Sequence, residues 1–146
     1  MSTETDVVLR YVDYLRTGDE EILETAFAPD FLDHVSGQRG TDIMRVVRGW
    51  IAGSFADLTY EVHGVTTGDG LVMAWFSSRG RHVGNAFPQL AGREPTGREI
   101  VAEAVHIFRV ADGKITEHWA VRDDLGLLRQ LDGGEAGGDR PRREDS

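Results

Sequence analysis

The chain has 146 residues, of which 40% are hydrophobic and 28% charged, as is typical of a single soluble globular domain. Its 16 basic and 25 acidic residues give a net charge of −9, which argues against a nucleic-acid or anionic-membrane surface. The absence of cysteine excludes disulfides, a thiolate nucleophile and a sulfur-ligated metal. Because no secretory leader pattern and no apolar run of about 20 residues is present, we expect a cytoplasmic protein that does not bind membranes.

Three helices are expected first along the chain. Residues 3–17 place apolar side chains at three-to-four spacing, and Gly18 is a natural stop. Asp19 is a suitable N-cap for a shorter helix that ends near Pro29, and Thr41 is a suitable N-cap for a third that runs to Ile51. Residues 31–35 form a short segment that could be extended.

After Asp57 the apolar period changes from about 3.6 to 2, which indicates β-strands. Residues 58–63 and 71–82 alternate around the turn TTGDG, and residues 100–110 and 114–123 flank the hairpin signal ADGK. The segment VGNAFPQLAGREPTG (83–97) is a long loop, a kind that is usually functional or disordered. A short helix over 125–131 ends the predicted domain, 1–131, and 132–146 is predicted to be a disordered tail.

Helices followed by consecutive antiparallel strands predict an α+β fold. A curled sheet with helices over its concave face would leave an apolar pocket that opens at one end. The sequence pattern alone does not prove that curvature.

Alternation along the strands assigns side chains to faces. His106 is the only polar residue in an otherwise apolar row, so it is expected to point inward, as is His82. In the last strand, strict alternation places Asp123 in the inward row with Trp119 and Val121, while Asp124 faces solvent or caps the last helix. Desolvation would raise the pKa of an inward Asp123 and let it exchange a proton near neutral pH. The competing interpretations are a helix cap for Asp123 and a hydrogen-bonded core residue for His106.

Other chemistry finds little support in the sequence. The five histidines show no spacing typical of a metal site, and no nucleophile elbow, phosphate loop or dinucleotide fingerprint is present. We therefore expect neither a metal nor a cofactor. Aromatic side chains are candidates for substrate contacts, with core packing as the alternative; they are Tyr14, Trp50, Trp75, Phe76 and Trp119.

Five segments, in their order and at their separations, resemble the SnoaL-like polyketide cyclase family of the nuclear transport factor two-like (cystatin-like) superfamily. They are FLDHV, WFSSRGRHVG, EPTGREI, HIFRVADGKITEHW and VRDDLGLLRQL. The resemblance covers about residues 5–131. It implies a cone-shaped barrel of a strongly curved, mostly antiparallel sheet covered by three N-terminal helices, with a short C-terminal helix. It also implies a homodimer.

The resemblance further implies a cofactor-independent cyclase that closes a ring of a polyketide ester by intramolecular aldol condensation. Asp123 matches the family's acid/base aspartate, His106 matches an inward position near it, and His34 and His82 match histidines of the pocket wall. The loop over 84–97 is a few residues longer than is usual in the family, which would alter the mouth of the pocket.

Three alternatives remain open at this stage. Relatives of this kind include epoxide-opening cyclases, isomerases and hydroxylation proteins, and epoxide opening would require a second acid, Glu117 or Glu103, near Asp123. A member without catalytic activity would instead be a small-molecule-binding dimer. The family resemblance supports a pocket for a small, polyketide-like molecule more strongly than it supports any one reaction.

Overall fold

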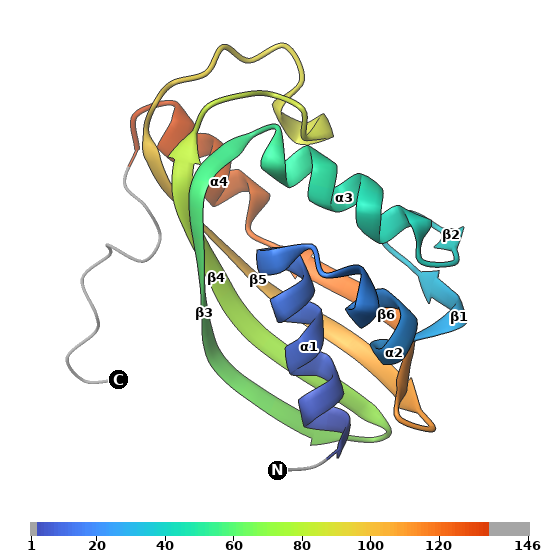
Figure 1. Cartoon of the computed structure of the whole chain (residues 1–146). Coiled ribbons are helices and arrows are strands. Elements are labelled where there is room, and N and C mark those ends of the chain that lie inside the picture. The colour runs from blue at the N-terminus through green and yellow to red at the C-terminus, as the bar shows by residue number, and fades with distance from the viewer. Residues whose placement is uncertain (1–2, 135–146) are drawn as a thin grey trace, which may run out of the picture.

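The computed structural model describes residues 3–134, and these residues form four α-helices, one 3-10 turn and six strands (Figure 1). The helices are α1 (Thr3–Thr17), α2 (Glu20–Ala26), α3 (Asp42–Ala52) and α4 (Asp124–Leu131), and the 3-10 turn is η1 (Pro88–Leu90). The strands are β1 (Phe27–Asp33), β2 (Gln38–Arg39), β3 (Phe55–Gly68), β4 (Leu71–His82), β5 (Glu99–Ala111) and β6 (Lys114–Arg122). Of the predicted tail, residues 135–146 lie outside the described residues.

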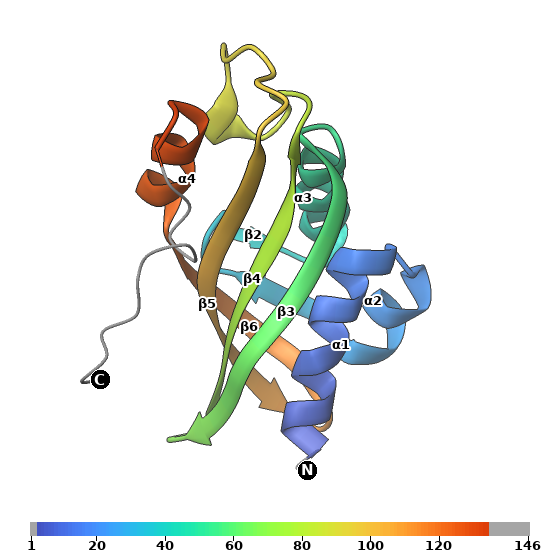
Figure 2. The same ribbon diagram turned by 90° about the vertical axis from the view of Figure 1, so that its left-hand side faces the viewer.

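The six strands form one mixed sheet in the order β2-β1-β6-β5-β4-β3. All neighbours are antiparallel except β1 and β6, which are parallel. The sheet is strongly curved, with α1, α2 and α3 on its concave side, and α4 lies beside the upper part of β5 (Figure 2). The predicted α+β class is confirmed. The sheet does not close on itself, because β2 and β3 are free edges, so the expected barrel is an open, curved sheet.

The core lies between α1 and the concave face of the sheet. The apolar stripe predicted for α1 is buried in full and consists of Val7, Val8, Tyr11, Val12, Tyr14 and Leu15. It packs against inward side chains of the strands, among them Phe76 and Phe108. A smaller apolar cluster of Leu90, Ile100 and Leu131 joins η1 and α4 to the upper end of the sheet.

An irregularity in β6 changes which face each of its later residues occupies. Arg109 pairs with Glu117, but the next residue of β5, Val110, pairs with Ile115, so Thr116 is an extra residue in β6. Such a β-bulge breaks the alternation of side chains. Ile115 and His118 are consequently both buried, although they are three residues apart.

The long loop between β4 and β5 is fastened at both ends. The backbone amides of Val83 and Gly84 donate to the carbonyl of Ser54 at 2.8 and 3.1 Å. At the other end, the amide of Gly97 donates to the carbonyl of His82 at 2.9 Å. These bonds place η1 above the end of the sheet, beside α3 (Figure 1).

No helix within residues 3–134 is both long enough and apolar enough to cross a membrane.

Two glycines offer a test of the loop anchor. A Cβ on Gly84 would overlap the carbonyl oxygen of Gly53, whereas a Cβ on Gly49, in α3, would meet open space. We expect Gly84→Ala to lower the free energy of unfolding by about 1–3 kcal/mol through overpacking. Gly49→Ala, the matched control, should raise it by about 0.5–1 kcal/mol through helix propensity. Urea denaturation measures both, and an unchanged midpoint for Gly84→Ala would contradict the anchor.

Candidate active site

A cavity of about 140 Å³ lies between the concave face of the sheet and helices α1 and α3. Its walls are mostly apolar and include Met44, Val47, Ile51 and Phe76. A second, more open hollow of about 370 Å³ adjoins it beneath η1. The residues that line both are Asp33, Val35, Val47, Phe87, Gln89 and Arg122. An apolar pocket with few polar groups is the usual form of a small-molecule site.

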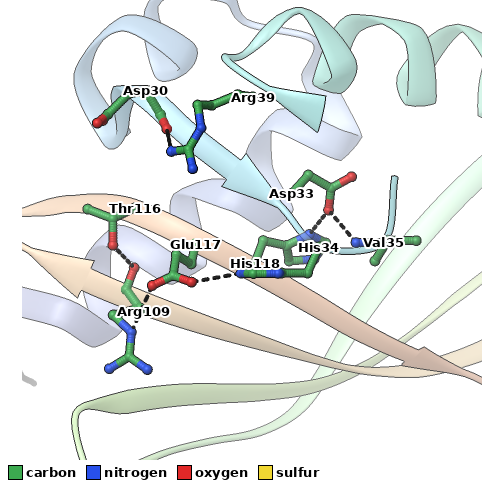
Figure 3. A network of polar contacts seen from close by, with 9 residues as sticks. All are labelled: Asp30, Asp33, His34, Val35, Arg39, Arg109, Thr116, Glu117 and His118. Atoms are coloured by element: carbon green, nitrogen blue, oxygen red, sulfur yellow. Dashed lines mark hydrogen bonds and ion pairs between the residues drawn. The ribbon is translucent and has the colours of Figure 1, made fainter. Parts of the chain in front are cut away.

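Three buried polar side chains form a hydrogen-bonded chain along this cavity. The Oδ1 atom of Asp33 lies 2.9 Å from Nδ1 of His118 (Figure 3). The Nε2 atom of His118 lies 2.8 Å from Nδ1 of His106. All three side chains line the cavity and are 4%, 5% and 8% exposed, respectively. These hydrogen bonds contribute to stability, because a buried polar group without a partner lowers the free energy of unfolding.

The parallel pairing of β1 with β6 places Asp33 in this chain. Asp33 is the last residue of β1 and pairs directly with His118. Its carboxylate also accepts hydrogen bonds from the hydroxyl and amide of Ser36, at 2.7 and 3.2 Å, and from the amide of Val35 at 3.3 Å. Burial raises the pKa of Asp33, but the hydrogen bonds from His118 and Ser36 outweigh burial and leave this pKa below its ordinary value. Asp33 is therefore a carboxylate at neutral pH.

The carboxylate fixes one proton of the chain. A carboxylate can only accept, so Nδ1 of His118 carries a proton. With His118 neutral, its Nε2 accepts from Nδ1 of His106, and Nε2 of His106 is then the unprotonated end of the chain. Burial lowers the pKa of His106 well below its ordinary value, and the charges of His118 and Arg122 add to this effect. His106 is therefore neutral at physiological pH and able to accept a proton.

Tyr11, from α1, covers the two histidine rings. Its ring centroid lies 5.4 Å from that of His106 and 5.1 Å from that of His118. Burial, and then the negative charge of Asp33, raises the pKa of Tyr11. Its hydroxyl group stays protonated and can donate a hydrogen bond within the cavity.

The structure places three of the predicted site residues, His106, Phe76 and Asp123, along the lining of the cavity. His106 points inward as predicted, and Phe76 packs on it with ring centroids 4.6 Å apart. Their roles in binding or catalysis stay predictions.

Asp123 lies at the rim of the cavity and not in the apolar interior that the sequence predicted. Its side chain is exposed, and its Oδ1 accepts from the amide of Gly126 at 2.9 Å as the N-cap of α4. Its role in catalysis stays a prediction. The β-bulge at Thr116 is the physical reason, since it moves every later residue of β6 to the opposite face. His118, Ala120 and Arg122 line the cavity, whereas Val121, in the row of Asp123, is 66% exposed.

The same change of face moves His34 and Trp119 away from the predicted pocket wall. The two rings stack on the outer side of the sheet, with centroids 4.4 Å apart and planes 2° apart. Nε2 of His34 lies 2.7 Å from a carboxylate oxygen of Glu117, whose other oxygen accepts from Arg109 at 3.0 Å (Figure 3). The hydrogen bond from His34, and then that from Arg109, lowers the pKa of Glu117.

Four further predicted residues also lie outside the lining of the main cavity. Trp75 is 46% exposed on the outer face, where its indole N–H donates to Glu103 at 2.7 Å. His82 is fully buried beneath the long loop, where its Nδ1 accepts from the amide of Thr96 at 3.1 Å. Tyr14 is part of the apolar core, and Trp50 lines only the second hollow.

Asp33, His118 and Arg122 are functional candidates that sequence reasoning missed. Strict alternation had placed His118 and Arg122 on the outer face. The sequence allows residues 31–35 to be extended, but nothing in this segment marks Asp33 as the partner of a histidine in the last strand. Within residues 3–134, no group of three or more His, Cys, Asp or Glu side chains is arranged to hold a metal ion.

A curved α+β sheet that encloses an apolar cavity around a buried Asp–His–His chain defines a small-molecule enzyme of the cystatin-like architecture. The family model of the SnoaL-like polyketide cyclases matches residues 5–131, and the chain belongs to this family. It is accordingly an enzyme of the polyketide cyclase type.

Similar proteins support this assignment. The chain is 34% identical over 137 residues to the aklanonic acid methyl ester cyclase DauD of Streptomyces sp. (strain C5). This alignment covers 90% of this chain and 83% of the relative. It is 30% identical to the nogalonic acid methyl ester cyclase of Streptomyces nogalater, over 82% of this chain and 90% of that one. The structure of IdmH from Streptomyces antibioticus matches with a TM-score of 0.74 and 27% identity, over 88% and 98% of the chains. That of TsrD from Streptomyces laurentii matches with 0.76 and 25%, over 88% and 94%.

The cap on α4 predicts the effect of removing Asp123. We expect Asp123→Ala to lower the free energy of unfolding by about 1 kcal/mol, the usual value of an N-cap. Asp30→Ala is the control, since Asp30 is exposed on β1 and only its backbone carbonyl is hydrogen-bonded. Equal urea midpoints for the two variants would show that the cap contributes nothing.

Burial of neutral His106 predicts a pH dependence of stability. The folded state binds fewer protons at this site than the unfolded state, whose histidine pKa is about 6.5. The contribution is therefore complete above that pH and is lost as the pH falls below it. We expect His106→Phe to flatten the decline in unfolding free energy between about pH 7.5 and 5.5. Urea denaturation at a series of pH values measures this, and parallel curves for variant and wild type would contradict it.

Proposed function

We propose that this enzyme closes a ring of a polyketide-type ester by intramolecular aldol-type condensation, with His106 as the acid/base. The observation that carries the proposal is the buried Asp33–His118–His106 chain, which ends at His106 in the wall of the apolar cavity. The methyl ester cyclases among its relatives support the substrate class.

The reaction requires the movement of one proton, which His106 removes from the substrate and later returns. Nε2 of His106 takes the proton α to the ester or ketone carbonyl, and an enolate forms. The enolate carbon then attacks a second carbonyl of the same molecule, making the new C–C bond and an alkoxide. His106 returns its proton to the alkoxide, so the product is an isomer of the substrate and the enzyme is unchanged.

Asp33 and His118 act as positioning residues in this scheme. Each time His106 gains a proton, its Nδ1–H remains bonded to His118, and the carboxylate of Asp33 stabilises the positive charge through that ring. The same logic operates in other enzymes where a buried carboxylate orients a catalytic histidine.

The cavity contributes by holding a flexible substrate in a folded, reactive shape. Its apolar walls exclude water from the enolate, and prior orientation of the two reacting carbons can supply several kcal/mol of the barrier reduction, up to about 7–11 kcal/mol in favourable cases. The direction in which the substrate enters is suggested by the second hollow, which opens beneath η1.

Epoxide opening is less well supported by the arrangement of acids. Glu117 lies on the outer face in ion pairs with His34 and Arg109. The carboxylate of Glu103 lies on the outer face, where it accepts the indole N–H of Trp75. The depressed pKa of Asp33 makes that side chain a poor proton donor.

Three isosteric variants test the assignment of the base. With aklanonic acid methyl ester as substrate, we expect His106→Gln and Asp33→Asn to lower kcat by about 10²-fold or more, the usual contribution of a general base. Asp123→Asn should stay within a few-fold of wild type, since its side chain caps a helix at the rim. Circular dichroism confirms folding of each variant. If Asp123→Asn instead abolishes turnover while His106→Gln retains it, the acid/base is Asp123 and the present proposal fails.

A further inference from the structure

Arg122 is the cation of the cavity. It is the last residue of β6, on the inward side created by the β-bulge, and it lines both the main cavity and the adjoining hollow. Among the described residues that line these two spaces it is the only lysine or arginine. In a chain with a net charge of −9, a single inward guanidinium is an unusual placement that calls for a reason.

Arg122 and His106 share one face of the sheet on neighbouring strands. His106 pairs with Ala120, and Arg122 pairs with Ala104, so the two side chains are diagonal neighbours. Diagonal neighbours in an antiparallel pair are about 7–8 Å apart at the backbone, within reach of long side chains. The positive charge of Arg122 also contributes, after burial and the charge of His118, to the lowered pKa of His106.

The guanidinium group is held in place but only partly neutralised. It lies over the ring of Phe87, with Cζ 5.2 Å from the ring centroid. Its one recorded ion pair within residues 3–134 joins Nε to Oδ1 of Asp124 at 3.5 Å, and the Asp124 side chain is 41% exposed. Asp123 also lines this end of the cavity. Among the residues that the structure describes, no hydrogen bond or ion pair occupies the terminal nitrogens of the guanidinium, which can donate to an oxyanion.

We propose that Arg122 binds the carbonyl oxygen on which negative charge develops during ring closure. The site would accordingly select substrates that place an ester or ketone oxygen against Arg122 while the adjacent carbon faces His106. This inference rests on the proposed function, because it identifies the group that stabilises the negative oxygen formed when His106 removes the α proton.

The step is balanced in charge. As His106 takes the α proton and becomes positive, the carbonyl oxygen becomes the negative enolate oxygen, and Arg122 stays protonated throughout. When the C–C bond forms, the carbonyl at Arg122 is restored and the proton moves from His106 to the new alkoxide. Fixed donors aimed at developing charge are often the largest single contribution to catalysis.

Turnover of aklanonic acid methyl ester by charge variants gives the first test. Arg122→Gln should lower kcat by about 10²–10³-fold, as for loss of one oxyanion donor. We expect a smaller change in KM, and partial recovery of kcat in Arg122→Lys. The matched control is Arg79→Gln, the same substitution at an exposed residue of β4. Arg79 pairs with Val101 of β5. Wild-type kcat in a folded Arg122→Gln variant would overturn the proposal.

Binding of an unreactive pair of probes separates this inference from the proposed reaction. The wild type should bind anthraquinone-2-carboxylate at least about tenfold more tightly than its neutral methyl ester, as followed by tryptophan fluorescence, because hydrogen bonds to charged groups contribute about 1.5–3 kcal/mol. Arg122→Gln should remove this preference, and Arg79→Gln should keep it. An unchanged preference in Arg122→Gln would overturn the assignment even if turnover were lost.

The turnover and binding experiments distinguish a failure of the proposed function from a failure of the oxyanion site. If the wild type does not convert aklanonic acid methyl ester but shows an anion preference that depends on Arg122, the substrate of the proposed function is wrong and the oxyanion site stands. If the wild type converts the ester with no contribution from Arg122, the proposed function stands and the oxyanion site is wrong.

Discussion

The extra residue in β6 is the constraint on which the site depends. Because Thr116 has no partner in β5, the strand turns over once, and His118 and Arg122 face the cavity instead of the outer surface. Without that change of face, Asp33 would have no histidine beside it and the cavity would contain no cation. The bulge thus decides the chemistry of the cavity, although it lies near the hairpin at the far end of the strand. Bulges near active sites commonly re-aim side chains in this way.

The buried Asp–His–His chain is stable because each side chain is a hydrogen-bond partner for the next. A lone carboxylate in this position would have a raised pKa and would lose its charge, but the bonds from His118 and Ser36 reverse that tendency. Burial also lowers the pKa of His106, because it disfavours the positive form of the ring. The turn that follows Asp33 therefore contributes directly to the chemistry.

Features that depend on local periodicity could be predicted from the sequence. The stripe on α1, the cap at Asp19, the hairpin at ADGK and the inward orientation of His106 are all present. Alternation fails only where a bulge intervenes, and nothing in the residues 114–118 distinguishes a bulge from a regular strand. The prediction for Asp123 inherited that one-residue error, and the competing interpretation of a helix cap describes its geometry. The pairing of β1 with β6 could not be predicted from the sequence either, because no local pattern links residues that far apart.

The parallel contact between β1 and β6 joins Asp33 to His118 across 85 positions of the chain. During synthesis on the ribosome, the carboxylate emerges long before either histidine of the chain, and the second histidine arrives only with the final strand. Contacts of such large sequence separation form slowly, since a long loop must close before they bring any gain. The Asp–His–His chain is therefore complete only when the last strand docks, and a chain that stops short of β6 has an early carboxylate with no ring to orient.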